Sequence, residues 1–491
     1  MSALSFADDI LLVSDTFEGL QGLVCQTEAY FDNVDLVINP SKSQYFGWRI
    51  NHYTHGKQYD LPRLQFQDSD LASIAPDHPI KYLGLELFVN KSPNVNPAKA
   101  ESLLKLIGSA SLKPFQKLRC IRQLVAPALL YAVSNTLDVL NESRRWDKTL
   151  GMRIKTLMHL PTQFPRSHIW LPSRNGGLGT LQLERVAQAV QFKSLCRLLR
   201  LGDPVVDVLF DEILGTCHAR IASVFEVPVG ITDPKSVDAA LKRAAAKWWT
   251  DMRDMYTNKD LFAHSQQQRA NAWLYHDSKL LNDRDRIRAL RLRTNLAPTR
   301  TLYNKHASDP AARDCRRCGE RPETAFHILQ ECEVINLSRQ ERHNFVSRQI
   351  ARLAKEKVPG ATVTEEKVFT TKEGVRLKPD LVLQVGKEVV IVDVAVTWDS
   401  NEGILKQKCK DKVQKYSSLK GLFPGCSVSI HGMAFGARAM LCRETMDAGA
   451  AMGLSPQDMS WLAACVLRGG LIMLQRFSSR VLGRGGPGAY L

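Results

Sequence analysis

The alternation of hydrophobic and polar positions predicts a small α+β region at the start of the chain. Residues 4–13 contain two short apolar runs on either side of Asp8 and Asp9, which predicts two strands joined by a turn at the acidic pair. A helix, a strand interrupted by an Asn-Pro turn and a further strand are predicted next, at residues 17–35, 36–50 and 80–88. With so few strands, this region looks incomplete as a domain.

The rest of the chain is predicted to be helical first and then α/β. From about residue 98 to 310, apolar residues recur every three or four positions, most clearly at 112–140, 143–160, 184–202 and 235–258. Three consecutive strands are then predicted within residues 368–398. The other predicted elements are helices at 337–357, 402–420 and 455–479 and a strand at 427–436. We therefore expect a multidomain α+β protein.

Composition and charge indicate a folded protein with a polyanionic partner. The chain is 44 % hydrophobic, which excludes wholesale disorder. Its length of 491 residues corresponds to about three domains. No apolar run approaches the roughly 18 residues that a membrane span needs, and the N-terminus lacks the basic start of a signal peptide. The net charge is +16, although residues 1–97 carry 12 acidic and only 6 basic side chains. The strongly basic remainder favours nucleic acid as a partner.

Four metal-ligating residues cluster in one short segment. Cys315, Cys318, His327 and Cys332 occupy an 18-residue span, and ligands of these types at this spacing can close a tetrahedral Zn2+ site. Four protein ligands leave no open position, so the predicted zinc is structural. A chance cluster of cysteines is the alternative. The remaining cysteines of the eleven are scattered, and without a signal peptide they indicate a reducing compartment, either nucleus or cytoplasm.

Arginines gather just before and within this cysteine segment. They do not segregate to one clean helix face, so one interpretation is a merely solvated surface, whereas the adjacent zinc knuckle favours contacts to phosphates. Such contacts would position nucleic acid without specifying its sequence. The predicted phosphate-binding residues of this part of the chain are Arg288, Arg291, Arg293, Arg300, Arg316 and Arg317.

Further acidic residues fall on predicted strands. Asp380 begins one strand and Asp393 lies inside the apolar run VVIVDVAVTW, where an ionised carboxylate is costly unless it is paired or binds a metal. Adjacent strands would bring both carboxylates to one edge, where they could bind Mg2+ or Mn2+ and activate water. The alternative is a strand aspartate that caps a turn beside a solvated lysine-rich helix. The acids Asp8 and Asp9 likewise suit either a divalent cation or a solvated turn.

The first region resembles the palm of a reverse transcriptase. Its FADD sequence, with Asp8 and Asp9, resembles the catalytic hairpin. The following LVINPSKS resembles the next palm motif, with Lys42 at the basic position, and YLGLELF resembles the primer-grip strand. The resemblance implies Mg2+ at the two aspartates and a nucleic-acid contact at Lys42. Only five residues precede FADD, so the upstream palm aspartate and the fingers are missing, and we expect no polymerisation by this chain alone.

The C-terminal strands resemble the core of a restriction-like PD-(D/E)xK nuclease, with Asp380 and Asp393 as its two acids. One position departs from that family, because the lysine usual two residues after the second acid is Ala395 here. The following helix offers replacements, either Lys410 or Lys412, and a tyrosine on the same face as the latter, Tyr416. The resemblance implies that these residues form a metal-dependent catalytic site for DNA cleavage.

The order of palm motif, helical thumb, CCHC knuckle and nuclease with a displaced lysine resembles the polyprotein of non-LTR retrotransposons that carry a restriction-like endonuclease, the ribosomal-DNA-inserting type. The resemblance implies a C-terminal part of such a polyprotein, truncated at its 5′ side. It divides the chain into a partial palm, a helical thumb with its connector, a basic linker with the knuckle, an endonuclease and a Gly-rich tail, at residues 1–95, 96–250, 251–345, 346–480 and 481–491.

Proteins of this family nick target DNA and prime reverse transcription of their own RNA from the nick. The implied partners are therefore target DNA and element RNA, with no membrane and no small-molecule substrate beyond nucleotides. The implied cofactors are structural Zn2+ and catalytic Mg2+ or Mn2+. Metal-dependent DNA nicking is the activity expected to be intact, because the polymerase is incomplete. The alternatives are a zinc-dependent nucleic-acid-binding protein without catalysis and an inactive relic of the element.

Overall fold

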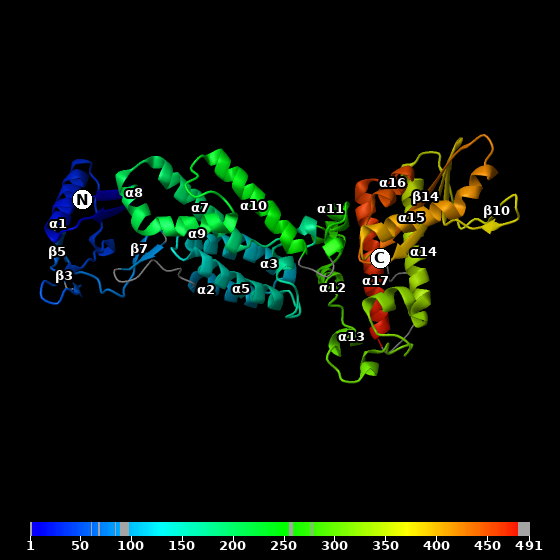
Figure 1. Ribbon diagram of the computed structural model, residues 1–491, viewed down its shortest axis with the longest axis horizontal. Coiled ribbons are helices and arrows are strands. Elements are labelled where there is room, and N and C mark those ends of the chain that lie inside the picture. Colours follow the sequence, from blue (N-terminus) through cyan, green and yellow to red (C-terminus); the bar gives the residue numbers. More distant parts are fainter. Residues whose placement is uncertain are drawn as a thin grey trace. The chain divides into compact units, whose positions relative to one another are not determined.

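The structure of the chain is a computed structural model that describes residues 2–59, 61–66, 69–83, 85–88, 98–254, 259–275 and 278–479 (Figure 1). The predicted Gly-rich tail at 481–491 lies outside the described residues. The described chain forms two compact units. Unit 1 comprises Met1–Leu106, Gln123–Lys148 and Gln182–Leu241, and unit 2 comprises Ile107–Arg122, Thr149–Leu181 and Lys242–Leu491.

Unit 1 begins with the predicted hairpin. Strands β1 (Ser2–Phe6) and β2 (Asp9–Val13) pair in antiparallel register with Phe6 opposite Asp9. The turn is therefore Ala7-Asp8, one residue earlier than predicted, and Ala7 takes a positive φ of 54°. Helix α1 (Phe17–Asn33) follows, and its N-cap Thr16 accepts a hydrogen bond from the Gly19 amide.

The strand predicted at 36–50 is mostly wrong. Pro40–Lys42 form a short 3-10 turn, η1, and only Arg49–Ile50 extend as strand β3. A proline fixes its φ and has no amide hydrogen to donate, so it ends pairing here. The further strands of this region make three two-stranded pairs, β3–β4, β5–β6 and β7–β8, with the partner bounds Lys57–Gln58, Leu64–Phe66, Ser69–Leu71, Ile80–Tyr82 and Leu85–Leu87. The predicted strand at 80–88 is thus a hairpin.

The middle of the chain is helical, as predicted, and contributes to both units. Helix α4 packs against α7 in unit 1. The helices of this middle part that lie wholly in unit 1 are α4 (Ala126–Ser134), α7 (Leu183–Leu201), α8 (Pro204–Leu209), the π-helical η4 (Phe210–Leu214) and α9 (Gly215–Phe225). Four helices have residues in both units, namely α2 (Ala98–Ser109), the π-helical η2 (Ile121–Val125), α5 (Val139–Leu157) and α10 (Pro234–Asp254).

Unit 2 starts with short helices that lead to the cysteine segment. They are α3 (Pro114–Cys120), α6 (Ser167–Trp170), η3 (Ser173–Asn175), η5 (Lys259–Phe262), α11 (Gln267–Ala270), η6 (Ala272–Leu274), α12 (Asp283–Arg293), α13 (Arg300–Tyr303), η7 (Pro310–Arg313), η8 (His327–Glu331) and η9 (Glu333–Ile335).

A four-stranded mixed sheet forms the centre of the C-terminal part of unit 2. Its strand order is β14-β13-β12-β9, with bounds Ser427–Gly436, Glu388–Thr397, Leu381–Val385 and Thr362–Glu365. Strands β13 and β14 are parallel, whereas the other pairs are antiparallel. A parallel pair needs a crossover connection, which helix α15 (Glu402–Tyr416) provides. Strands β10 (Phe369–Thr370) and β11 (Arg376–Leu377) form a separate small hairpin.

Helices cover the sheet (Figure 1). They are α14 (Asn336–Lys357), α15, α16 (Arg443–Ala451) and α17 (Pro456–Ser478). Alternate residues of β13 face opposite sides of the sheet. Val389 and Ile391 pack with Tyr416 of α15, and Ala395 packs with Leu405 of the same helix. Residue 393 therefore belongs to the row of β13 that faces α15.

Two buried histidines of unit 2 make its stability depend on pH. Burial and the charge of Arg293 lower the pKa of His168 to about 3 and the pKa of His264 to about 4. The unfolded chain takes up these protons below about pH 6.5, whereas the folded unit does not. Stability is therefore complete above pH 6.5 and falls as the pH is lowered.

As the pH is lowered from 6.5 to about 5, we expect each histidine to lower the free energy of unfolding by about 1.4 kcal/mol per pH unit. Urea unfolding across this range measures the slope. The double variant His168→Gln/His264→Gln should show a shallower slope than the native chain, whereas the exposed His306→Gln should not change it. Equal slopes in the native chain and the double variant would show that neither histidine is buried uncharged.

Among the described residues, no helix combines the length with the apolar composition that crossing a membrane requires.

Candidate functional site

The two acids predicted on the C-terminal strands meet across the sheet. Leu381 of β12 pairs with Val392 of β13, so one further step of the antiparallel register sets Asp380 opposite Asp393. An Asp380 carboxylate oxygen also accepts a hydrogen bond of 2.7 Å from the amide of Val394. The register thus sets the two residues at facing positions of neighbouring strands.

Asp393 is a buried carboxylate with a lysine partner. It is 4 % exposed, in the row of β13 that faces α15, and its Oδ2 lies 2.5 Å from Nζ of Lys412. Lys410 is exposed, and two residues along an α-helix turn the side chain by roughly 200°. The geometry thus selects Lys412, of the two lysines left open by the sequence, as the one that reaches the acids.

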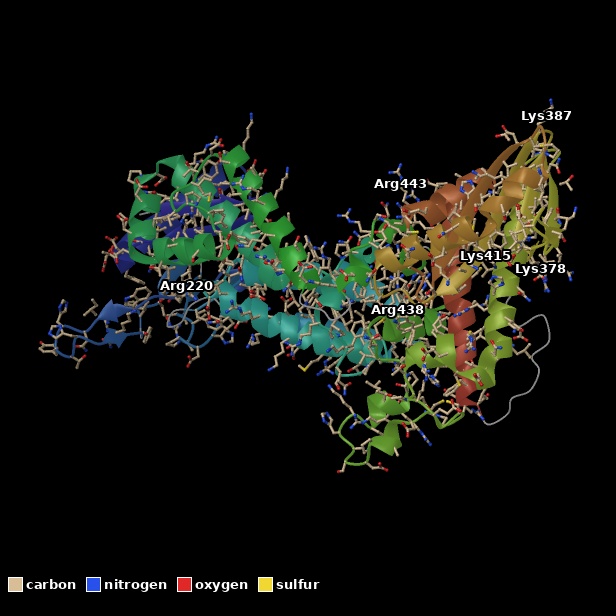
Figure 2. The ribbon with its side chains drawn as sticks, turned by 45° about the vertical axis from the view of Figure 1, so that its right-hand side comes forward. Arg220, Lys378, Lys387, Lys415, Arg438 and Arg443 are labelled. Atoms are coloured by element: carbon tan, nitrogen blue, oxygen red, sulfur yellow. The ribbon has the colours of Figure 1, made fainter. Side chains whose placement is uncertain are left out.

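Tyr416 completes the contact between α15 and the acids. Its hydroxyl donates a 2.9 Å hydrogen bond to the carbonyl of Lys378 and accepts one from Nζ of Lys415. Burial and the neighbouring carboxylates Asp393 and Asp380 raise the pKa of Tyr416, so its hydroxyl keeps its proton. Lys378 and Lys415 are both labelled in Figure 2. The ammonium of Lys378 pairs with Glu366, so only its backbone carbonyl takes part in the contact with Tyr416.

His343 is a residue of this site that the sequence did not reveal. It comes from α14, and its Nε2 lies 3.3 Å from Oδ2 of Asp380 and 3.1 Å from the carbonyl of Val394. The hydrogen bond to Asp380 raises the pKa of His343 to about 9, against the opposing effect of burial. Burial alone would raise the pKa of Asp380, but the hydrogen bond and charge of His343 leave it below its usual value.

The chemical capacity of this group follows from its donors. Two carboxylates with little exposure stand side by side, and oxygen ligands of this kind suit Mg2+ and Mn2+. The ammonium of Lys412 faces Asp393, and the Tyr416 hydroxyl lies close to both carboxylates while it donates its proton to the Lys378 carbonyl. Donors that face a pair of carboxylates can hold a phosphate against them, which is the arrangement that metal-dependent phosphodiester hydrolysis needs.

The predicted zinc ligands are gathered in a second group of unit 2. The ligand atoms of Cys315, Cys318, His327 and Cys332 all lie within 4.8 Å of one another. Tetrahedral zinc sets its sulfur ligands about 3.8 Å apart and a sulfur and a nitrogen about 3.5 Å apart. The observed separations are 3.9 Å between the sulfurs of Cys315 and Cys332 and 3.3 Å between Cys318 Sγ and His327 Nε2. The four donors therefore fit a zinc ion.

Local backbone structure brings these ligands together. Residues 327–331 form the π-helical turn η8, and the amide of Cys332 donates to the carbonyl of His327, an i to i+5 bond that puts both ligands on one side. The other His327 nitrogen, Nδ1, lies 3.7 Å from the carboxylate of Glu331, a usual outer partner for a zinc histidine. Burial and the charge of Cys315 raise the pKa of Cys332 to about 12, so this thiol needs a metal to ionise readily.

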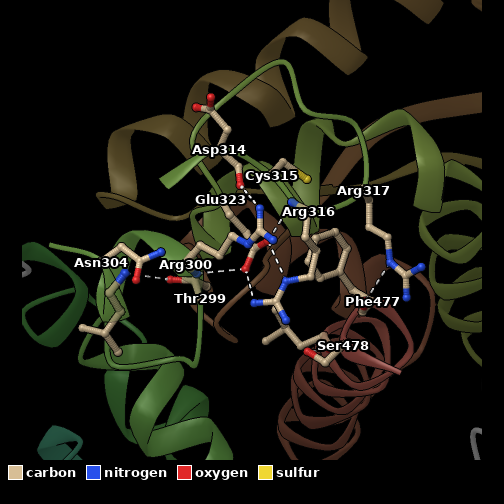
Figure 3. A network of polar contacts seen from close by, with 12 residues as sticks. Thr299, Arg300, Asn304, Asp314, Cys315, Arg316, Arg317, Glu323, Phe477 and Ser478 are labelled. Carbon is tan, nitrogen blue, oxygen red and sulfur yellow. Dashed lines mark hydrogen bonds and ion pairs between the residues drawn. The ribbon is translucent and has the colours of Figure 1, made fainter. Parts of the chain in front are cut away.

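A buried glutamate ties the knuckle together (Figure 3). Glu323 is fully buried, and its carboxylate accepts hydrogen bonds from the Arg300 amide and from the amide and guanidinium of Arg316. Arg317 donates to the carbonyl of Phe477 at the end of α17. The guanidinium groups of Arg316 and Arg317 are thus engaged within the fold.

The other predicted phosphate-binding arginines also have contacts within unit 2. Arg293 is 1 % exposed and donates to the carbonyl of Arg438 and to Asn271. Arg291 donates to the carbonyl of His159. Arg288 donates to Gln475 at 3.1 Å, and the guanidinium of Arg300 donates to the carbonyl of Asp314 at 3.3 Å.

The predicted site residues of the first region are exposed. Asp8 lies in the turn of the β1–β2 hairpin, and Asp9 begins β2. Lys42 lies in η1 with its side chain in solvent. Among the described residues, the Cys3His group is the one metal-ligand cluster of three or more His, Cys, Asp or Glu residues.

Comparison with known proteins relates nearly the whole chain to one group. The chain is 25 % identical over 486 residues to a retrovirus-related Pol polyprotein from a type-1 retrotransposable element R2 of Popillia japonica, and the match covers 96 % of each chain. A second such polyprotein of Popillia japonica is 27 % identical over 479 residues, which are 94 % of this chain and 63 % of the relative.

A third relative comes from Drosophila melanogaster. The Pol polyprotein from the type-2 retrotransposable element R2DM of Drosophila melanogaster is 24 % identical over 494 residues, which are 97 % of this chain and 45 % of the relative. This chain thus spans less than two thirds of the length of two of the three relatives. No family model matches it. This chain is a homologue of the Pol polyproteins of R2-type non-LTR retrotransposable elements.

Proposed function

We propose that residues 346–480 are a metal-dependent endonuclease that nicks DNA. The observation that carries the proposal is the pairing of Lys412 with Asp393, directly across β12–β13 from Asp380. A buried aspartate in an apolar strand is costly, and here it is retained beside a second carboxylate, a lysine and a tyrosine. These residues together are suited to bind a phosphodiester and a divalent cation, whereas apolar residues at the same positions would stabilise the fold more.

The residues have separate roles in the proposed hydrolysis. Asp380 and Asp393 would hold Mg2+ or Mn2+, which supplies Lewis-acid activation of water. The ammonium of Lys412 neutralises negative charge that develops on the phosphate as water adds to phosphorus and the P–O bond breaks. The leaving oxygen takes a proton, and the attacking water gives one up. His343 keeps the Asp380 carboxylate oriented and ionised.

The R2 relatives give this activity its proposed setting. We infer that nicking of target DNA precedes reverse transcription of element RNA, and that residues 1–95 correspond to part of a palm in which Asp8 and Asp9 bind Mg2+ and Lys42 contacts nucleic acid. The proposed partners are therefore DNA and RNA. The exposure of Asp8 and Asp9 leaves both carboxylates available to a metal.

A lysine substitution pair tests the nuclease. With Mg2+ and supercoiled plasmid, we expect Lys412→Met to lower the nicking rate by about a hundredfold, because one charged donor to a developing anion contributes on this scale. Lys410→Met should keep the rate of the native chain, since its side chain points away from the acids. The fraction of nicked circles over time measures both.

Two results would contradict this assignment. Loss of nicking in Lys410→Met with full activity in Lys412→Met would show that the other lysine serves the site. A native chain that leaves plasmid intact with both Mg2+ and Mn2+, yet binds nucleic acid, would favour the second candidate function. That candidate is a zinc-dependent nucleic-acid-binding protein without catalysis, and the close fit of the Cys3His group to zinc is the observation in its favour.

A further inference from the structure

A basic cleft of about 370 Å3 lies in unit 2, and neither the nuclease site nor the Cys3His group contributes to it. Its walls come from α3 and the lysine before it, from Arg122 of η2, from Leu178 of the glycine-rich loop, and from Leu274 and residues 278–286. The charged side chains that line it are Lys113, Arg119, Arg122, Lys279, Arg286 and Asp283. Five of these six are cationic.

The single carboxylate of the cleft does not balance its cations. An Asp283 carboxylate oxygen accepts a 3.3 Å hydrogen bond from the amide of Phe115, and the carboxylate lies 4.0 Å from Arg286. Arg286 itself is 4 % exposed and donates to the carbonyls of Leu281 and Ser278. These contacts hold the wall together. In the part of the chain that the structure describes, Arg119, Arg122 and Lys279 form no ion pair.

Arg122 is the cation of this cleft with the least compensation from the protein. It is partly buried, and its Nε has no hydrogen-bond partner among the described residues. Burial lowers the pKa of Arg122, and no carboxylate opposes that effect. Burial of a cation without a partner raises the free energy of the folded state, and a bound anion would lower it again. Gly179 leaves room beside it, since a Cβ there would lie 3.1 Å from the Arg122 guanidinium.

The arrangement of the cations distinguishes a chain of phosphates from a single small anion. Lys113 and Arg122 are nine residues apart, which corresponds to about 13 Å along a helix axis, so the cations are spread along the cleft and not gathered at one point. The ring of Phe115 lines the same cleft. A groove that combines spaced cations with an aromatic ring is typical of sites for single-stranded nucleic acid.

We propose that this cleft binds the phosphate backbone of single-stranded nucleic acid. The site is separate from the proposed nuclease, so it goes beyond that function and does not depend on it. Arg119 and Arg122 contact phosphates from the α3–η2 wall, and Lys279 contacts them from the opposite segment. Phosphate contacts of this kind position a strand without reading its sequence.

Binding measured by fluorescence anisotropy tests the proposal. The full chain with Asp393→Asn, which removes cleavage, is titrated with labelled oligo(U) and oligo(dT) of about a dozen nucleotides over a range of salt. We expect Arg119→Gln/Arg122→Gln to weaken binding by about tenfold or more. Because each phosphate contact to a single strand contributes about 0.7 to the salt slope, the slope should fall by about 1.4.

A matched control removes the same charge elsewhere on unit 2. Lys387 and Arg443 are exposed (Figure 2), and Lys387→Gln/Arg443→Gln should leave both affinity and slope close to the values of the parent chain. Lys279→Gln changes an exposed side chain and should lower the slope by about 0.7 without affecting folding.

The two probes separate the sources of the phosphate. Equal losses with oligo(U) and oligo(dT) support recognition of the shared backbone, whereas a loss with oligo(U) alone supports the site and adds a contact to the ribose hydroxyl. The proposal is overturned if Arg119→Gln/Arg122→Gln and Lys279→Gln bind both probes as the parent does, or if the control double variant shows the same losses. Nicking by the native chain is unaffected by either result, so the nuclease is judged separately.

Discussion

Asp393→Asn is expected to reduce plasmid nicking by about a thousandfold, equivalent to about 4 kcal/mol of lost transition-state stabilisation. Asparagine keeps the size of the side chain but removes the charge that faces Lys412 and that the divalent cation requires. The nicking rate under saturating Mg2+ measures the loss. Thermal unfolding of the same sample shows whether the sheet is intact, because Asp393 lies among the buried residues of β13.

The matched control for this variant lies on the adjacent helix. Asp411→Asn removes an equal charge from α15, where the Asp411 carboxylate is exposed and accepts a hydrogen bond from Gln407. It should nick at the rate of the native chain. The double variant Asp393→Asn/Lys412→Met should be little worse than Asp393→Asn, since residues that act together lose their effects together. Nicking by Asp393→Asn at the native rate would contradict the assignment of the catalytic site.

Removal of zinc should unfold the cysteine segment of unit 2. Structural zinc contributes on the order of 10 kcal/mol of apparent binding free energy in small zinc modules, because the site does not exist in the unfolded chain. We expect one zinc ion per chain by native mass spectrometry and none in Cys318→Ser. Chelation should lower the melting temperature and increase protease cleavage within residues 300–335.

A control variant separates the effect of losing zinc from the effect of removing any cysteine. Cys25 is exposed and distant in sequence from the cluster, so Cys25→Ser should keep its zinc and its melting temperature. The knuckle is also held by the ion pair between the buried Glu323 and the more exposed Arg316, neither of which is a zinc ligand. A chain purified without zinc whose melting temperature does not respond to chelator would show that the pair alone suffices and that the zinc assignment is wrong.

Local patterns were the part of the fold that the sequence predicted well. The β1–β2 hairpin, α1, α14, α15, β14 and α17 each follow from periodicity and turn residues within a short window. The Cys3His group follows from the same kind of information, because two of its three spacings, Cys315 to Cys318 and His327 to Cys332, are short enough for one knuckle or one helical turn. The sequence did not predict strand β9. Thr362–Glu365 is short and has a single buried residue among three exposed ones, which is too little for a recognisable alternation.

Long-range contacts were the part that the sequence could not provide. His343 reaches Asp380 from a helix whose pattern marks only a basic surface, and a lone histidine gives no periodic signal. Arg293 carries a charge that suggests solvent or phosphate, yet it is buried against Asn271 and the Arg438 carbonyl, partners more than twenty residues away in either direction. The choice between Lys410 and Lys412 needed the position of β13, which only the folded sheet supplies.

Because the ammonium of Lys412 comes from α15 and not from β13, the proposed nuclease activity is linked to local unfolding of that helix. Leu405 and Cys409 anchor the helix on the sheet beside Ala395, whereas the sheet is held by its own strand pairing. Helix ends open with lower free energy than central strands. Opening of the last turns of α15 has to unpack the buried Tyr416 from Val389 and Ile391, and it withdraws Lys412 while the strand pairing stays in place. Amide exchange along α15 would then report how often Lys412 leaves Asp393, without any change in the sheet.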